Sequence, residues 1–141
     1  MGKRRIALII IGFILIAGLI YAGISKPQEV VLNINGKNYT FIQEANYSQE
    51  LSGLMNANFL GLYVYNAEGM LFPNYLNSTP FCFWMHNTYI PLNQIWVENN
   101  TVVAVYEAQP LDNTPICYNG TEVIEIPAFF YANVYVGDRV V

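Results

Sequence analysis

The chain has 141 residues, enough for one domain beside a membrane segment, and its formal net charge is −4. Charged residues make up only 11% of the chain, so Asn, Thr, Ser and Tyr supply most of its polarity. Three of the six basic residues lie within the first five positions, which leaves three against ten acids and a net charge near −7 beyond them. That balance argues against nucleic acid or an acidic lipid surface as a partner.

The N-terminus is typical of a membrane anchor. Three basic residues over 3–5 precede an uncharged apolar run over 6–24, and 19 residues in a helix span roughly 28 Å, close to the hydrocarbon thickness of a bilayer. A cleaved signal peptide is the alternative, but its apolar core should be shorter and end in an A-x-A-like site, which "YAGIS" does not offer. We expect residues 1–5 on the cytoplasmic side of the cell membrane, 6–24 as a single-pass anchor, 25–29 as a linker, and 30–141 as an extracytoplasmic domain.

The first elements beyond the linker are a hairpin and a helix. Asn35-Gly36 between two β-rich runs predicts a two-residue turn. Next, "NYSQELSGLMNANFLG" predicts a short helix, with Ser48 as its N-cap and Leu51, Leu54 and Met55 on one face.

The remainder of the chain predicts mostly strands. "EGMLF", "PFCFWMH" and "TEVIEIP" are short apolar segments, and "NQIWVENNTVVAVYEAQ" predicts a second hairpin that turns at Asn99-Asn100. "AFFYAN" predicts one helical turn before a last strand, "VYVGDRVV". The predicted class is mainly β (α+β), a compact β barrel or sandwich with one or two short helices.

Two patterns suit an exported domain. Five N-x-[ST] sequons are candidate glycosylation sites, and an Asn-rich composition without glycans is the alternative. Cys82 and Cys117 are predicted to form a disulfide, against the alternative of two buried free thiols. The sequons begin at Asn38, Asn46, Asn77, Asn99 and Asn119.

The order of several segments resembles a known family, the domain of unknown function 192. "GLM", "GMLF", "FWMHNTYIPLNQIWV", "VIEIP" and "GDRV" follow one another as GLM, GMLF, FWMKNT, PLD, VLEL and GD do in that family, over residues 44–141. The resemblance implies a small, mainly β domain, often exported or tethered to a membrane, without an agreed activity. His86 stands where the family usually has Lys, Asn93 where it has Asp, and Asn56 where it has Arg, so a role that needs a Lys–Asp pair is in doubt.

The residues give little support for catalysis or metal binding. His86 is the only histidine, and no catalytic motif or Gly-rich phosphate loop is present. Glu122 and Glu125 lie three residues apart in a predicted strand, so their side chains are on opposite faces of it. The pattern does not decide which of the two faces the core. Met55, Met70, Met85, His86 and the two cysteines could bind Cu(I), but the methionines lie in apolar segments and no close ligand spacing occurs. We therefore predict neither metal nor cofactor and no catalytic residue.

The segment from Phe81 to Thr88 is the main candidate for a site. In a strand, Phe81, Phe83 and Met85 share one face, and we expect Phe83 and Met85 in the core with Met70 and Phe72. Trp84, His86, Asn87 and Thr88 are the candidate ligand-binding residues, unless this cluster serves only to fill the core and end a strand. The preferred function is a non-catalytic binding module for a small molecule, a glycan or a surface protein. The alternatives are a structural component of a cell-surface assembly and an unrecognised hydrolase.

Overall fold

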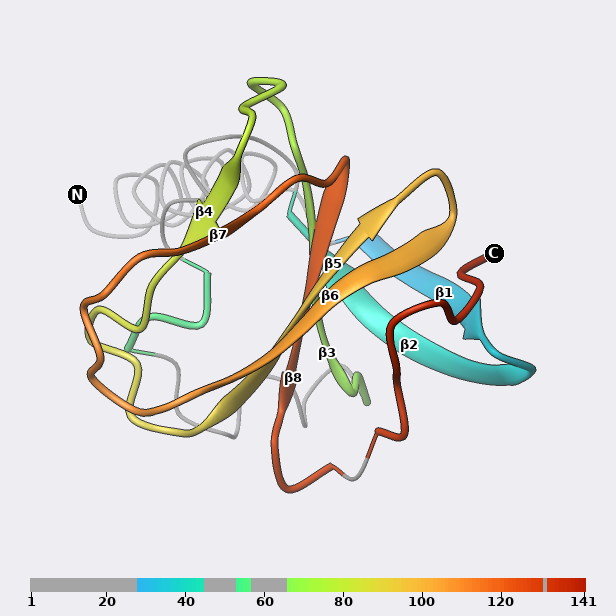
Figure 1. Cartoon of the computed structure of the whole chain (residues 1–141). Helices are drawn as coiled ribbons and strands as arrows, with labels where there is room; N and C mark the ends of the chain where they lie inside the picture. Colours follow the sequence, from blue (N-terminus) through green and yellow to red (C-terminus); the bar gives the residue numbers. More distant parts are fainter. Residues whose placement is uncertain (1–27, 45–52, 57–65, 131) are drawn as a thin grey trace, which may run out of the picture.

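The computed structural model describes residues 28–44, 53–56, 66–130 and 132–141, which form strands in two sheets (Figure 1). The larger sheet has six strands and the smaller has two. In chain order the strands are β1 (Gln28–Ile34), β2 (Lys37–Gln43), β3 (Gly69–Pro73), β4 (Phe81–Phe83), β5 (Leu92–Glu98), β6 (Thr101–Ala108), β7 (Ile116–Tyr118) and β8 (Glu122–Pro127).

Both predicted two-residue turns are confirmed. Asn35 and Gly36 have φ values of 49° and 88° between β1 and β2, and Asn99 and Asn100 have 50° and 59° between β5 and β6. Positive φ at both central residues is what the type I′ turn requires, and Asn and Gly adopt it at the lowest steric cost. These four residues therefore fix the register of the two outer hairpins.

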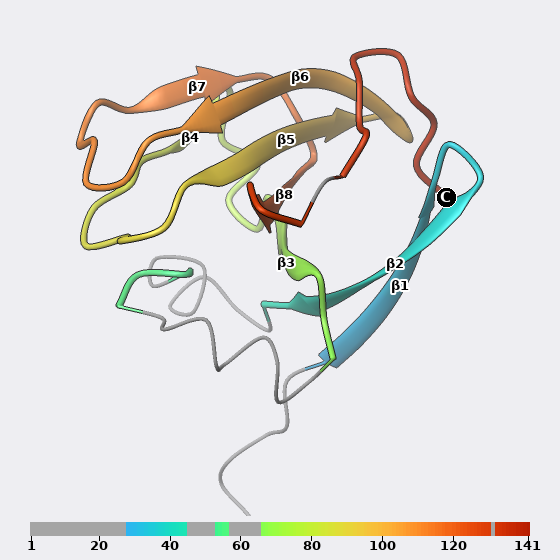
Figure 2. The ribbon, with the colours of Figure 1, turned by 90° about the horizontal axis from the view of Figure 1, so that it is seen from below.

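The six-stranded sheet is open, so the expectation of a closed barrel is wrong. Its order is β1-β2-β3-β8-β5-β6, with β2 and β3 parallel and the other neighbours antiparallel. β1 and β6 are its two edges, and Figure 2 shows the β1–β2 hairpin turned well away from β5 and β6. The smaller sheet pairs β4 with β7.

The C-terminal residues link the two edges where a barrel would pair them directly. Val141 exchanges two backbone hydrogen bonds with Asn33 on β1, and Arg139 forms an isolated bridge with Thr101 on β6. The predicted strand over 134–141 is therefore wrong in extent. A turn interrupts it, in which the backbone N–H of Tyr135 donates to Asp138 Oδ2 and Gly137 has a φ of 98°.

The predicted helices are not present in the described residues. Most of the predicted helix over 46–61 lies outside the described residues, and its described part, 53–56, is a turn. Residues 128–130 form a turn in which the Phe130 N–H donates to the Pro127 carbonyl, with no helix. The predicted anchor over 6–24 also lies outside the described residues, and within the described ranges no helix is long and apolar enough to span a membrane.

Both faces of the central strands are buried. On one face lie Ile34, Phe41, Leu71, Ile95 and Ile124, covered by side chains from the C-terminal segment. The other face carries the expected core residues Met70, Phe72 and Met85, and Phe83 packs against them while remaining partly exposed. The β4–β7 pair covers this second face, and the candidate site lies between the two.

Candidate functional site

A disulfide fixes one wall of the site. Cys82 on β4 lies directly opposite Cys117 on β7, and the two form the disulfide predicted from the sequence, with a Cα–Cα distance of 4.1 Å. The wall is also anchored to the main sheet, because the buried indole of Trp96 on β5 donates from Nε1 to the carbonyl of Phe81 at 2.8 Å. The strand β4 is therefore held to β7 by pairing and the disulfide, and to β5 by the Trp96 hydrogen bond.

Side chains alternate along β4 and just beyond it. Phe81 and Met85 are buried and Phe83 is partly buried, with its ring centroid 5.2 Å from that of Phe72. Trp84, by contrast, is 54% exposed. The period of two in the sequence thus separates core residues from residues that face solvent, as expected for a strand.

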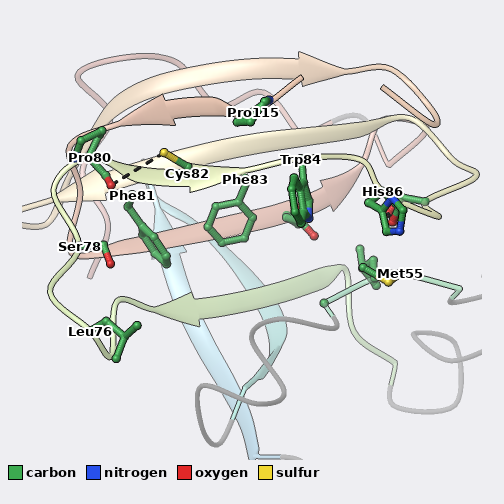
Figure 3. A pocket seen from close by; sticks show the side chains of 14 residues that line it. Met55, Leu76, Ser78, Pro80, Phe81, Cys82, Phe83, Trp84, His86 and Pro115 are labelled. Carbon is green, nitrogen blue, oxygen red and sulfur yellow. Dashed lines mark hydrogen bonds between the residues drawn. The ribbon is translucent and has the colours of Figure 1, made fainter. Parts of the chain in front are cut away.

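A pocket of about 480 Å³ opens beside this wall, and we call it the Trp84 pocket. Figure 3 shows the side chains of Phe81, Phe83 and Trp84 in a row along one side, with Leu76 and Met55 across from them. Its volume falls in the usual range for small-molecule sites. The lining residues are Gly53, Leu54, Met55, Leu76, Ser78, Pro80, Phe81, Cys82, Phe83, Trp84, His86, Thr88, Pro115 and Glu125.

The main sheet contributes a carboxyl group to the pocket. Antiparallel pairing places Glu125 on β8 directly between Met70 on β3 and Gln94 on β5. Val123, two residues earlier on β8, belongs to the core cluster beneath β4, so Glu125 faces the same side. Glu122 falls on the opposite face, as the spacing predicts. Glu125 is thus the acid that points inward, a point that the sequence left open.

Burial controls the chemistry of Glu125, which is only 4% exposed. Desolvation is the main reason that the pKa of its carboxyl is raised to about 7. A hydrogen bond from Gln94 lowers this pKa, and the nearby charge of Glu44 raises it. Gln94 Nε2 donates to Glu125 Oε1 at 3.0 Å, and the buried Gln94 Oε1 has no hydrogen-bond partner. The acid therefore changes charge near neutral pH.

Two glycines of the family-like motifs lie against Glu125, one at its backbone and the other near its carboxyl. A Cβ on Gly69 would lie 2.1 Å from the backbone oxygen of Glu125, so no side chain fits there. Gly53 has a φ of 44°, and a Cβ on it would contact the Phe72 ring at 3.4 Å and lie 3.9 Å from Glu125 Oε2. The "GLM" turn thus lies close to the second carboxyl oxygen, with no side chain at Gly53 to cover it.

The structure brings together three of the four predicted ligand-binding residues. Trp84, His86 and Thr88 line the pocket, although Thr88 is buried and its hydroxyl donates to the His86 carbonyl at 3.3 Å. Asn87 does not line it. Its φ is 50°, and its carbonyl accepts a hydrogen bond from the Asn56 N–H at 2.9 Å, which is a turn role.

His86 and Asn93 stand where the family usually has a Lys and an Asp, but only His86 lines the pocket. Its Nδ1 lies 2.9 Å from Asn113 Oδ1, and its ring centroid is 5.9 Å from that of Trp84. Asn93, the residue where the family usually has Asp, lies on β5 opposite Ile126 and does not line the pocket. His86 therefore belongs to the rim of the pocket beside Trp84.

Sequence reasoning missed the polar pair of Glu125 and Gln94. The available signal was weak, because Glu125 alone of the two has apolar neighbours on both sides, whereas Gln94 follows the polar Asn93. Glu125 stands between Ile124 and Ile126, and Gln94 precedes Ile95. A polar side chain there must be buried and paired, which often marks a functional site.

The expected absence of a metal and the predicted glycosylation sites both stay predictions. Among the described residues no group of three or more His, Cys, Asp or Glu side chains is placed to hold a metal. Of the candidate sulfur ligands, Met70 and Met85 are core residues and Met55 lines the pocket. Asn46 lies outside the described residues, and the other four sequon asparagines are exposed: Asn38, Asn77, Asn99 and Asn119.

These features define a small β-rich domain in which an open twisted sheet and a disulfide-linked strand pair enclose an aromatic pocket around a buried acid. The chain belongs to the DUF192 family, described as "Uncharacterized ACR", which matches residues 30–141. No curated protein sequence matches it.

Two solved structures share the fold. A protein of unknown function from Novosphingobium aromaticivorans is 29% identical with a TM-score of 0.67, covering 84% of this chain and 89% of its own. A proposed transcription regulator from Sinorhizobium meliloti is 23% identical with a TM-score of 0.69, covering 84% of this chain and 97% of its own. The first agrees with the mainly β fold, and the second shows likeness of fold alone.

Proposed function

We propose that this protein is a membrane-anchored, extracytoplasmic binding module that holds a small molecule in the Trp84 pocket. The observation that carries the proposal is the pocket itself, about 480 Å³ in volume, with aromatic side chains along β4 and the carboxyl of Glu125 within it. Apolar walls with one or two placed polar groups are the usual composition of a small-molecule site.

A small molecule suits the pocket better than a glycan chain or a surface protein. Glu125 is almost completely buried, so only a compact group can reach it. Long glycans and proteins bind to open grooves or broad faces, whereas here the acid shares a pocket with residues of the strand β4 and the turn 53–56. The function therefore depends on the interior of the pocket as well as on its rim.

Two alternatives each have one supporting observation. Cell-surface assembly is supported by exposed apolar side chains near the edge strand β1, namely Val31 and Val141. Hydrolysis is supported by the raised pKa of Glu125, which suits a general acid. However, Glu125 is the only carboxylate among the described residues that line the pocket, and acid pairs are usual in glycoside hydrolysis.

Fragment screening by ligand-observed NMR tests the binding function. The full-length chain, held in lipid nanodiscs, should bind small aromatic fragments, and Trp84→Ala should remove most of this binding while leaving the fold intact. Tyr135→Ala is the matched control, because Tyr135 is 64% exposed and lies outside the pocket. Equal binding by wild type and Trp84→Ala would place the fragments elsewhere and refute the proposal.

Protease protection tests the proposed topology. The basic residues over 3–5 before the apolar run predict that protease added to intact cells digests the domain and spares the N-terminus. A soluble mature chain that starts near Ser25 would instead show a cleaved signal peptide. Deglycosylation followed by mass spectrometry tests the exposed sequons in the same preparation.

A further inference from the structure

Among the described residues, no cationic side chain is paired with the carboxyl of Glu125. Of the basic side chains that the structure describes, Lys37 lies over the Tyr39 ring at 4.6 Å, and neither it nor Arg139 lines the pocket. The one hydrogen bond to the carboxyl that the structure records comes from the neutral amide of Gln94. A buried carboxylate without a positive charge nearby is unstable in the ionised form.

The surroundings of Glu125 favour a positively charged group. Phe83 and Trp84 line the same pocket, and aromatic faces attract cations, most strongly where water is excluded. Among the described lining residues there is no Lys or Arg to repel such a group. An ammonium group would satisfy the carboxylate, and an attached ring or alkyl group would cover the apolar walls.

We propose that the ligand of the Trp84 pocket is a small organic amine whose ammonium group binds to the Glu125 carboxylate. This inference rests on the proposed binding function and names its ligand class. Gln94 is a positioning residue, because its amide holds Glu125 Oε1 and leaves Oε2 for the ligand. Trp84 and Phe83 provide the surfaces on which the rest of the ligand lies.

Binding of such a ligand should depend on pH. Below about 7 the carboxyl of Glu125 is protonated, so its attraction for an ammonium group is lost. Among the described residues, two other titratable groups bear on the site, Glu44 just after β2 and His86 on the rim. Met70 and Gln94, which flank Glu125 on the neighbouring strands, do not titrate.

Calorimetric titration of the full-length chain with 2-phenylethylamine and with the neutral 2-phenylethanol tests the inference. At pH 8 the amine should bind at least tenfold more tightly than the alcohol. Its affinity should fall roughly tenfold for each pH unit below about 7, since an alkylammonium remains charged there. The affinity for the alcohol should stay constant with pH.

Variants separate the contribution of Glu125 from other effects. Glu125→Gln should remove both the preference for the amine and the pH dependence. Glu122→Gln is the matched control, since Glu122 lies on the opposite face of the same strand and does not line the pocket, and it should leave both unchanged. His86→Asn should keep the pH dependence, whatever its absolute affinity.

The outcomes distinguish the inference from the proposed function. If wild type binds the alcohol as tightly as the amine, and Trp84→Ala weakens both, the pocket binds small molecules but the amine assignment is refuted. Tighter binding of the alcohol would assign the pocket to neutral, hydroxyl-bearing ligands. If neither the amine nor the alcohol binds at millimolar concentration, the inference is overturned and the result counts against the binding function as well.

Discussion

Replacement of Glu125 by Gln should change how the stability of the protein depends on pH. The folded state raises the pKa of this carboxyl from the ordinary value of 4.5 to about 7. Below pH 4.5 the carboxyl is protonated in both the folded and the unfolded state, so its contribution to stability is complete. Between pH 4.5 and 7 only the unfolded state ionises, and above 7 both states do. Stability is therefore lost as the pH rises through this window.

The size of the effect follows from the two pKa values. Each pH unit within the window changes the free energy of unfolding by about 1.4 kcal/mol, so wild type should lose about 3 kcal/mol between pH 4.5 and 7. Glu125→Gln imitates the protonated acid and removes this loss. The variant should thus gain about 3 kcal/mol relative to wild type across the window.

Urea denaturation measures the difference. The fluorescence of the buried Trp96 can report unfolding at pH 4.5, 5.5, 6.5 and 7.5 for wild type, Glu125→Gln and Glu122→Gln. Burial also raises the pKa of Glu122, so the Glu122→Gln control should flatten the profile slightly and keep most of the slope. A constant difference between wild type and Glu125→Gln would show that Glu125 titrates like an exposed acid and would refute the reasoning.

Three further predictions concern stability. Reduction of the Cys82–Cys117 bridge, whose residues are 35 apart in the sequence, should lower the melting temperature. The chain-entropy model gives a loss of about 4 kcal/mol in the free energy of unfolding, and an unchanged melting temperature would contradict it. In chemical denaturation Phe83→Ala should cost about 2–4 kcal/mol and the fully buried Phe72→Ala more, and the reverse order would be inconsistent with the packing. Gly69→Ala should cost at least about 3 kcal/mol or prevent folding, because its Cβ would clash with the backbone of Glu125, and a variant of wild-type stability would disprove that close approach.

The sequence predicted local structure where single residues determine it. Asn35-Gly36 and Asn99-Asn100 predicted two hairpins, because few residue types other than Asn and Gly adopt the positive φ that both turn positions require. The alternation from Phe81 to His86 separated core from surface. The two cysteines had one intramolecular pairing available, and the structure contains it.

The sequence did not predict how distant strands meet. An open sheet and a closed barrel use the same alternating strands, and only the turn at Gly137 shows why the C-terminal residues bridge the edges instead of forming a long strand. The carboxyl in the pocket escaped prediction for a similar reason. Glu125 meets Gln94 through pairing across 31 residues, a register that no local pattern reveals.

A crystal structure of the chain with 2-phenylethylamine at pH 8 would test the central claim most directly. We predict the aromatic ring of the probe against Trp84 and Phe83, with its ammonium nitrogen within hydrogen-bond distance of the Glu125 carboxylate. A probe bound outside the Trp84 pocket, or a pocket filled by the protein's own side chains, would contradict the account.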